Sequence, residues 1–464
     1  MAVRSGLPIR FDLAGALESQ HMEWSLNFHW GEDVPVETFA PTIPEGHRGP
    51  TCGGYWRGRQ VMTRFSALLP AVVILVGLPL LQNSPEVHPE QTDPAALAEL
   101  NTAFGFDLYH QLCEGEGNLF FSPHSLSVCL AAAWAGARGR TEQEMATVLH
   151  LPLAGPSVHE AFRGLQACLD DIQTRGDIVL QAANSVWYQQ GQRFLDTYFN
   201  LVRSCYGADP TAVDFADNAE AARRIINSWA ELHTDRAITE LIRPGLIGPM
   251  TALVLCNAIH FKGAWASPFD PSFTAEADFS LRNGRFVRVP MMMRNSSLRW
   301  RAFDGFRAAE LPYVGEDLSM IIVLPDQVEG LYLLEPSFTA QNVQGWLEDL
   351  EATEPHEGEL LLPKFSTTCE LELAGVLSAM GMPTAFHGAD FSGITGTREL
   401  FISEVVHQSS LDVSEEGTEA AAAAAAIFRK GPPAFRVDRP FFFLIREHST
   451  GSILFMGRIT DPTR

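Results

Sequence analysis

The sequence predicts an α+β fold, organised as one large domain after residue 93. Helical spacing of apolar residues dominates the first half of this region, and strand-like runs dominate the second half. Helices and strands do not alternate as they do in parallel α/β folds. The chain has 464 residues, 46% hydrophobic and 19% charged, which is an ordinary composition for a globular protein.

The predicted elements follow in chain order. A first helix begins at Asp93, where an Asp-Pro start precedes apolar residues three and four positions apart, and a second helical run covers residues 125–137. Further helices are expected at residues 159–172 and 218–242. Strands are expected at residues 177–189, 251–263, 285–293, 307–314, 318–325, 358–365, 435–447 and 452–459.

Composition and motifs exclude several classes of function. The net charge of −23 argues against nucleic-acid binding, and a basic partner fits better. The helix at residues 160–173 carries more acid than base, so no strong heparin site is expected. The seven cysteines are widely spaced and lie mostly in apolar runs, which indicates buried thiols and no zinc site. Because no nucleophile elbow, metalloprotease or phosphate-loop motif is present, we expect no enzyme, no cofactor and no metal.

The N-terminal region reads as a targeting segment. Residues 65–81 are an uncharged apolar run just after Met62 and Arg64, so residues 62–84 are expected to be a signal peptide, with a signal anchor through residues 65–81 as the alternative. Residues 1–61 are an uncertain leader, expected to be unstructured. Secretion would make the single sequon at Asn295 a candidate glycosylation site.

Many separated motifs identify the family that the chain resembles. NLFFSPHSLS, AGARGRTEQEM, CNAIHFKGAWASPF, LPYVGEDLSMIIVLP, LPKFSTTCELELAGVLSAMGMPTAF and DRPFFFLIREHSTGSILFMGRI occur in the order found in the serpins, over residues 93–464. The resemblance implies three β-sheets, about nine helices and an exposed reactive loop. It further implies that a serine protease cleaves the loop, that a covalent complex forms and that the cut loop inserts into the central sheet of a monomer.

This resemblance changes the interpretation of the stretch EEGTEAAAAAAA. Propensity alone predicts a helix over the alanines with Thr418 as its N-cap. The resemblance implies instead a hinge whose small side chains permit insertion as a strand, with Thr418, Ala420, Ala422, Ala424 and Ala426 on one face. The matching hinge residues are Glu415, Glu416, Gly417, Thr418, Glu419, Ala420, Ala421, Ala422 and Ala423.

The basic residues of the loop suggest a trypsin-like target protease. Counting back from Pro440 by the family's usual spacing places the cleaved bond after Arg429, whereas counting forward from Gly417 places it after Gly431. The loop is therefore two residues short, and cleavage after Lys430 remains an alternative. A short loop also leaves open a non-inhibitory carrier that is cleaved as a substrate.

Other residues match the family's sheet-opening region. Ser122, Ser125, Asn257 and His407 correspond to a polar cluster beneath the point where the sheet opens, and an ordinary structural role is the alternative for each. Lys364 and Glu415 correspond to an ion pair near Trp265 at the end of that sheet. The strings SEEGTE and DRPF suggest the branch of plasminogen activator inhibitors and protease nexin.

Overall fold

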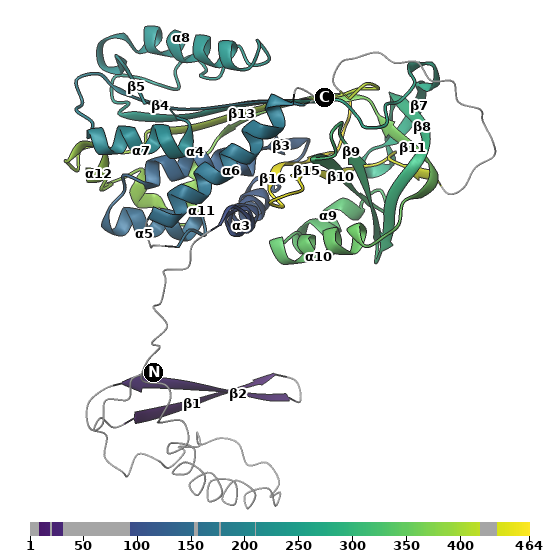
Figure 1. The fold of residues 1–464 in the computed structure, drawn as a ribbon, viewed down its shortest axis with the longest axis horizontal. Helices are drawn as coiled ribbons and strands as arrows, with labels where there is room; N and C mark the ends of the chain where they lie inside the picture. The colour runs from purple at the N-terminus through teal and green to yellow at the C-terminus, as the bar shows by residue number, and fades with distance from the viewer. Residues whose placement is uncertain are drawn as a thin grey trace, which may run out of the picture. The chain divides into compact units, whose positions relative to one another are not determined.

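The computed structural model describes residues 9–18, 21–30, 93–152, 156–175, 178–208, 210–417 and 434–464. The chain divides into two compact units, residues 1–86 and 87–464. Helices and strands of the larger unit are labelled in Figure 1.

In the smaller unit, two strands form an antiparallel hairpin. β1 (Ile9–Glu18) pairs with β2 (His21–Trp30) at every position from Ile9–Trp30 to Glu18–His21. The expectation that residues 1–61 are an unstructured leader stays a prediction for the residues outside this hairpin. The sequence contains a strand pattern here, because apolar residues alternate along both segments, as in LNFHW of β2.

The larger unit contains ten α-helices within the described residues, and some of them begin at a side-chain cap. α3 begins after Asp93, whose carboxylate accepts a hydrogen bond from Ala96 N–H at 2.7 Å, and α4 begins after Ser122, which caps Ser125 N–H at 3.1 Å. The ten helices are α3 (Pro94–Leu112), α4 (Pro123–Trp134), α5 (Gly139–Val148), α6 (Pro156–Thr174), α7 (Asp196–Tyr206), α8 (Phe215–His233), α9 (Gly330–Leu334), α10 (Ala340–Glu351), α11 (Ala374–Met380) and α12 (Ser392–Thr395).

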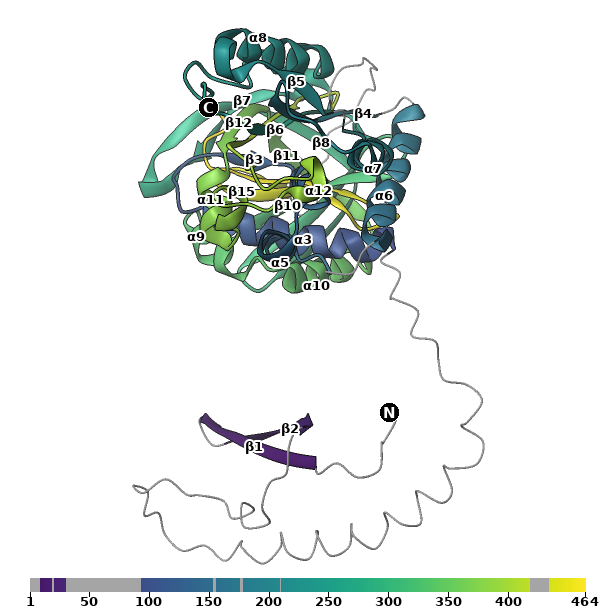
Figure 2. The same ribbon diagram turned by 90° about the vertical axis from the view of Figure 1, so that its left-hand side faces the viewer.

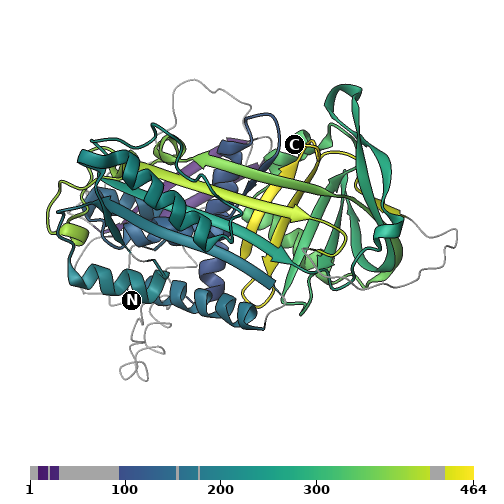
Figure 3. The same cartoon turned by 90° about the horizontal axis from the view of Figure 1, so that it is seen from above.

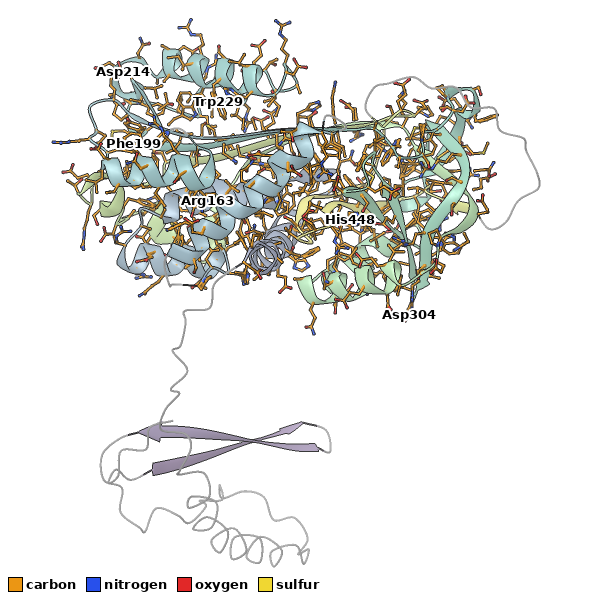
Figure 4. All side chains as sticks on the ribbon, in the orientation of Figure 1. Arg163, Phe199, Asp214, Trp229, Asp304 and His448 are labelled. Carbon is orange, nitrogen blue, oxygen red and sulfur yellow. The ribbon has the colours of Figure 1, made fainter. Side chains whose placement is uncertain are left out.

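A five-stranded sheet forms the centre of this unit. Its order is β12-β13-β6-β4-β5. The strands are β4 (Ile178–Gln189), β5 (Thr211–Val213), β6 (Leu253–Gly263), β12 (Phe365–Glu372) and β13 (Glu404–Val413). α8 lies across one face, seen from above in Figure 3, and Trp229 of α8 places its ring 5.8 Å from Trp187 of β4 (Figure 4).

A nine-stranded path makes the second layer, in the order β14-β11-β8-β9-β10-β15-β16-β3, with β7 paired to β8. The long β8 joins two sheets, because it pairs with β7 and β11 along its first part and with β9 at its end. Figure 2 shows α8 on one side of the strands and α3 and α10 on the other. The strands are β3 (Leu119–Phe121), β7 (Ala275–Ser280), β8 (Phe286–Phe303), β9 (Phe306–Pro312), β10 (Leu318–Pro325), β11 (His356–Pro363), β14 (Ala434–Arg436), β15 (Phe441–Glu447) and β16 (Ile453–Ile459).

The larger unit confirms the predicted α+β class. Its strands form three sheets, two of which share β8, and most of its helices precede residue 234 whereas most of its strands follow residue 250. The helix predicted at residues 218–242 is wrong beyond His233, since Thr234 ends α8 and Asp235 and Arg236 adopt positive φ values. Of the cysteines, Cys129, Cys205 and Cys256 are buried free thiols, whereas Cys113, Cys168 and Cys369 are partly exposed. The expectation of buried thiols therefore holds for half of the described cysteines.

Candidate functional site

The candidate site is a seam in the five-stranded sheet, defined here as the pairing between β6 and β13. These two strands lie in the middle of the sheet and run parallel, from Glu404 opposite Val254 to Leu411 opposite Phe261. Their outer neighbours, β4 and β12, pair with them antiparallel. A strand entering the seam in the opposite direction would thus be antiparallel to both β6 and β13.

A tight turn lies at the carboxyl end of the seam. After β13 ends at Val413, Ser414 and Gly417 exchange two backbone hydrogen bonds of 3.3 and 3.2 Å, which reverses the chain. The turn is fastened to the segment that follows β6, because Trp265 N–H donates to the Glu416 carbonyl at 3.3 Å. We call residues 414–417 the hinge turn.

Gly417 occupies a position of the hinge turn that only glycine can occupy without strain. Its φ is +92°, and a Cβ atom there would lie 2.3 Å from the Gly263 carbonyl oxygen and 2.6 Å from Trp265 N. The chain therefore passes directly against the end of β6 as it leaves the sheet.

Glu415 anchors the hinge turn through its side chain. Its carboxylate accepts hydrogen bonds from Lys364 Nζ at 2.9 Å and Thr274 Oγ1 at 2.8 Å, and its carbonyl accepts one from Phe269 N–H at 2.8 Å. Burial by itself would raise the pKa of Glu415, but the bonds from Lys364 and Thr274 hold that pKa below its ordinary value. Glu415 is consequently ionised at neutral pH and paired with Lys364.

Trp265 closes the other side of the hinge turn. Its indole N–H donates to the Ser414 carbonyl at 3.0 Å, and its ring stacks on Tyr313 with centroids 4.7 Å apart. Trp265 is 2% exposed, so this contact is part of the core. The structure thus places Trp265, Lys364 and Glu415 together, as the resemblance implies.

Ser122, Asn257 and His407 form a separate polar cluster along the seam, here called the seam cluster. Ser122 N–H donates to His407 Nε2 at 3.2 Å, so the ring proton lies on Nδ1, which donates to Asn257 Oδ1 at 2.5 Å. Asn257 Nδ2 then donates to Asn184 Oδ1 on β4 at 2.6 Å. The chain of bonds crosses the seam, because Asn257 is on β6 and His407 on β13.

Burial sets the charge state of the seam cluster. His407 is fully buried, and burial lowers its pKa to about 3, so the ring is neutral at physiological pH. Ser122 Oγ donates to the Leu454 carbonyl at 2.6 Å, whereas the buried Ser125 Oγ has no hydrogen-bond partner. Ser125 therefore contributes its backbone N–H to the helix cap, while Ser122, Asn257 and His407 make the link across the seam.

Sequence reasoning missed several partners of these residues. Asn184 and Thr274 were not singled out, because neither stands in a recognisable motif. Arg294 of β8 was also missed: its guanidinium lies 4.9 Å from the centroid of the Phe269 ring, is buried and leaves two nitrogens without hydrogen-bond partners. An arginine inside the apolar run VPMMMR was the available signal.

The remaining predicted site residues are the reactive-loop residues, which the structure does not describe, and Asn295, which it does. Thr418, Glu419, Ala420, Ala421, Ala422, Ala423, Arg429 and Lys430 fall in residues 418–433, outside the described residues. Asn295 lies on β8 opposite Glu359 of β11, with its side chain exposed, and its glycosylation stays a prediction.

A mixed five-stranded sheet whose parallel seam is bridged by a buried polar cluster and ends in a hydrogen-bonded turn defines the class of α+β protein found here. The chain belongs to a family of this class, the serpins: the family model described as "Serpin (serine protease inhibitor)" matches residues 99–462. The recognition made from the motifs is confirmed.

Individual relatives agree with this assignment. Human leukocyte elastase inhibitor is 38% identical over 381 residues, which cover 79% of this chain and 99% of that protein. Human thyroxine-binding globulin with its ligand has a TM-score of 0.73 at 30% identity, covering 80% of this chain and all of that one. Native protease nexin-1 with heparin has a TM-score of 0.72 at 31% identity over 80% of this chain and all of that one.

Two predictions made from the sequence need correction. Secretion, or anchoring through residues 65–81, is wrong on these comparisons: the relatives include leukocyte elastase inhibitors, which are matched over 99% of their own length, and the family match begins only at residue 99. Those residues lie outside the description, and no described helix is long and apolar enough to cross a membrane. The exclusion of an enzyme is also withdrawn, because the relatives' names state inhibition and leave enzyme status unstated.

Proposed function

We propose that this protein inhibits a trypsin-like serine protease as a suicide substrate, by inserting its cleaved reactive loop into the seam between β6 and β13. The observation that carries the proposal is the hinge turn, which reverses the chain at the end of the seam and presses Gly417 against the end of β6. Gly417, the last described residue before the loop, thus lies beside the end of β6.

Strand direction supports insertion energetically. Parallel pairs have slanted hydrogen bonds and are slightly less stable per residue than antiparallel pairs. A strand from Thr418 onward would replace one parallel pairing, β6 with β13, by two antiparallel pairings. Insertion would therefore add backbone hydrogen bonds as well as improve their geometry.

The loop length fits this step despite being two residues short for the family. Cleavage after Arg429 leaves Thr418–Arg429, which is 12 residues, and β6 has 11. At roughly 3.3 Å per residue, the inserted strand would reach the amino end of β6. The small residues Thr418, Ala420, Ala422, Ala424 and Ala426 would occupy one face of that strand and need little space.

Cleavage by such a protease requires that a basic residue of the reactive loop enter the primary specificity pocket of the protease. A trypsin-like protease carries an aspartate there, which pairs with Arg or Lys. The protease serine would attack the carbonyl carbon of Arg429 and form an ester, and the amine of Lys430 would leave with the downstream chain. Insertion before hydrolysis of the ester would retain the protease as a covalent complex with one copy of this chain. Cleavage after Lys430 would give a 13-residue strand by the same chemistry.

The direct experiment incubates the full chain with trypsin and identifies the products by denaturing gel electrophoresis and mass spectrometry. We expect a covalent band with the mass of protease plus the chain cut after Arg429, and an Arg429→Ala variant should lose most of it. Complete cleavage of the loop without any covalent band would refute inhibition by insertion.

A hinge variant tests the insertion step alone. Thr418→Arg would bury an unpaired charge during insertion. Burying an unpaired ion costs on the order of several kcal/mol of free energy. The variant should still be cut but form little complex, whereas Thr418→Ser should behave as the natural chain. Equal complex yields for both variants would count against insertion from Thr418.

A second candidate function is a non-inhibitory carrier, favoured by the short loop and by the similarity to thyroxine-binding globulin, whose structure holds thyroxine. A carrier would be cut without a covalent complex, and cutting would leave its melting temperature unchanged because no strand enters the sheet. If cleavage raises the melting temperature, by up to roughly tens of degrees, loop insertion and hence the inhibitory function would be favoured over the carrier function.

A further inference from the structure

A cavity lies at the amino ends of the two seam strands, opposite to the hinge turn. It has a volume of about 500 Å³ and is bounded by residues 248–251, which precede β6, and by residues 401–404, which lead into β13. α11 and the segment around Phe386 complete its wall. The cavity is therefore in contact with chain segments on both sides of the seam.

The wall of this cavity is mainly apolar. Phe386, Phe401, Ile402 and Ala374 line it, and Met250 lines it although the Met250 residue is 87% exposed. An exposed methionine next to aromatic rings offers a flexible apolar surface that adapts to a bound molecule. The volume is within the range that holds a small organic ligand, about 300 to 1,000 Å³.

One carboxylate in the lining lacks a counter-charge. Glu404, the first residue of β13, is half-buried, and burial together with the nearby Glu372 raises its pKa. The arginine in this region, Arg243, pairs with Glu370 and Glu372 instead. Within the described part of the chain, no lysine or arginine forms an ion pair with Glu404. A carboxylate held beside apolar groups gains from a cation that shares its low-dielectric surroundings.

We propose that this cavity binds cationic amphiphiles, molecules with an aromatic or aliphatic body and a protonated amine, with the body against Phe386, Phe401 and Met250 and the amine at Glu404. The chain's net charge of −23 would also attract such cations. Because the lining comes from both sides of the seam, an occupant would touch the segments leading into β6 and β13 together. Binding does not depend on the proposed inhibitory function.

The test compares three probes that share one body and differ only in the charge of the end group: phenylbutylamine, phenylbutanol and phenylvaleric acid. Binding of each probe to the full chain is followed at about pH 8, where a primary amine like that of lysine is protonated. We expect the amine to bind about fivefold more tightly than the alcohol, the gain typical of a partly exposed ion pair, and the acid to bind most weakly. Equal affinities for the three probes, or no binding of the amine, would overturn the proposal.

Two variants and one spectrum locate the binding. Glu404→Gln should reduce the affinity for the amine to that of the alcohol and leave the alcohol unaffected, while Glu399→Gln, which removes an exposed carboxylate outside the lining, should change neither. In methyl-labelled protein, the Met250 methyl signal, assigned from Met250→Leu, should shift on titration with the amine. Amine binding that leaves the Met250 signal in place, or that persists in Glu404→Gln, would assign the ligand to another surface and refute this site.

Discussion

The seam cluster and the hinge turn both link β13 or its end to neighbouring segments of the chain, but they use different interactions. In the seam cluster, neutral groups are joined by directed hydrogen bonds in a fully buried environment, from Ser122 through His407 to Asn257. At the hinge turn, an ion pair is partly exposed, with the Lys364 side chain 46% accessible and that of Glu415 11% accessible. The seam cluster should thus respond to protonation, whereas the hinge turn should respond to backbone geometry and, weakly, to salt.

The largest expected effect tests the backbone geometry of the hinge turn. Gly417→Ala places a Cβ atom 2.3 Å from the Gly263 carbonyl oxygen at a φ of +92°. Steric overlap and the left-handed conformation together should lower the free energy of unfolding by about 3 kcal/mol, measured by urea denaturation.

Gly191→Ala is the matched control for this experiment, because Gly191 has a φ of +87° with open space around its Cβ position. It should cost only about 1 to 2 kcal/mol for the left-handed conformation. If the two variants lose the same stability, the close contact between the hinge turn and β6 contributes nothing.

The second effect tests the seam cluster through pH. The pKa of His407 is about 3 in the folded protein and about 6.5 when unfolded, so between these values the unfolded chain binds more protons and acid lowers stability. The contribution is absent above pH 6.5 and grows as pH falls towards the folded pKa. At about pH 5, His407 should cost about 2 kcal/mol, since each pKa unit corresponds to about 1.4 kcal/mol.

The measurement is the free energy of unfolding from about pH 7 to pH 5, where ordinary carboxyls stay ionised. His407→Gln, which keeps a donor and an acceptor, should flatten this slope relative to the natural chain. His124, whose pKa burial lowers to about 4, adds a slope of the same sign that both proteins share. An unchanged slope in His407→Gln would show that the ring is not held neutral in the seam cluster.

The third effect concerns the buried guanidinium charge of Arg294. Arg294 packs over Phe269, and burial lowers its pKa to about 10, so it remains charged, with no carboxylate partner among the residues that the structure describes. Replacing an uncompensated buried charge by an apolar side chain of similar length should stabilise the fold, so Arg294→Met should raise the free energy of unfolding by about 1 kcal/mol or more.

Arg288→Met, at an exposed arginine of the same strand paired with Asp278, is the control and should change stability by less than about 1 kcal/mol. A loss of stability in Arg294→Met would mean that Arg294 has a partner in solution that compensates its charge.

The helices α3, α4, α6 and α8 and most of the long strands were predictable because their apolar patterns are local, whereas α5, α7 and α10 were not predicted. β13 was not predicted, since EVVHQSSLDV places His407, Ser409 and Ser410 in buried positions and hides the strand pattern. Those polar residues are buried because they bond across the seam and to β3, as Ser409 Oγ does to the Phe120 carbonyl at 2.7 Å. Such partners are far apart in sequence, so the apolar periodicity along a single strand does not indicate them.

The candidate site was predictable only as a set of family positions. The resemblance implied Ser122, Asn257 and His407 as one polar cluster and Lys364 and Glu415 as a separate ion pair, but it did not give the hydrogen bonds that join Ser122, His407 and Asn257. The proton position on His407 and the contact of Gly417 with β6 depend on three-dimensional packing. The sequence therefore supplied these residues as a prediction, and the structure supplied the directions of the hydrogen bonds between them.

The smallest effect tests the ion pair of the hinge turn. Lys364→Met removes the cation but leaves Thr274 bonded to the Glu415 carboxylate, so the free energy of unfolding should fall by about 1 kcal/mol or less. The loss should shrink further in high salt, because the Debye length falls to about 3 Å at 1 M. Arg140→Met, which breaks an exposed helical pair with Glu144, gives the baseline for an ion pair away from the sheet. A Lys364→Met loss that exceeds that of Gly417→Ala would reverse the comparison, since charge would then hold the hinge turn more strongly than backbone geometry does.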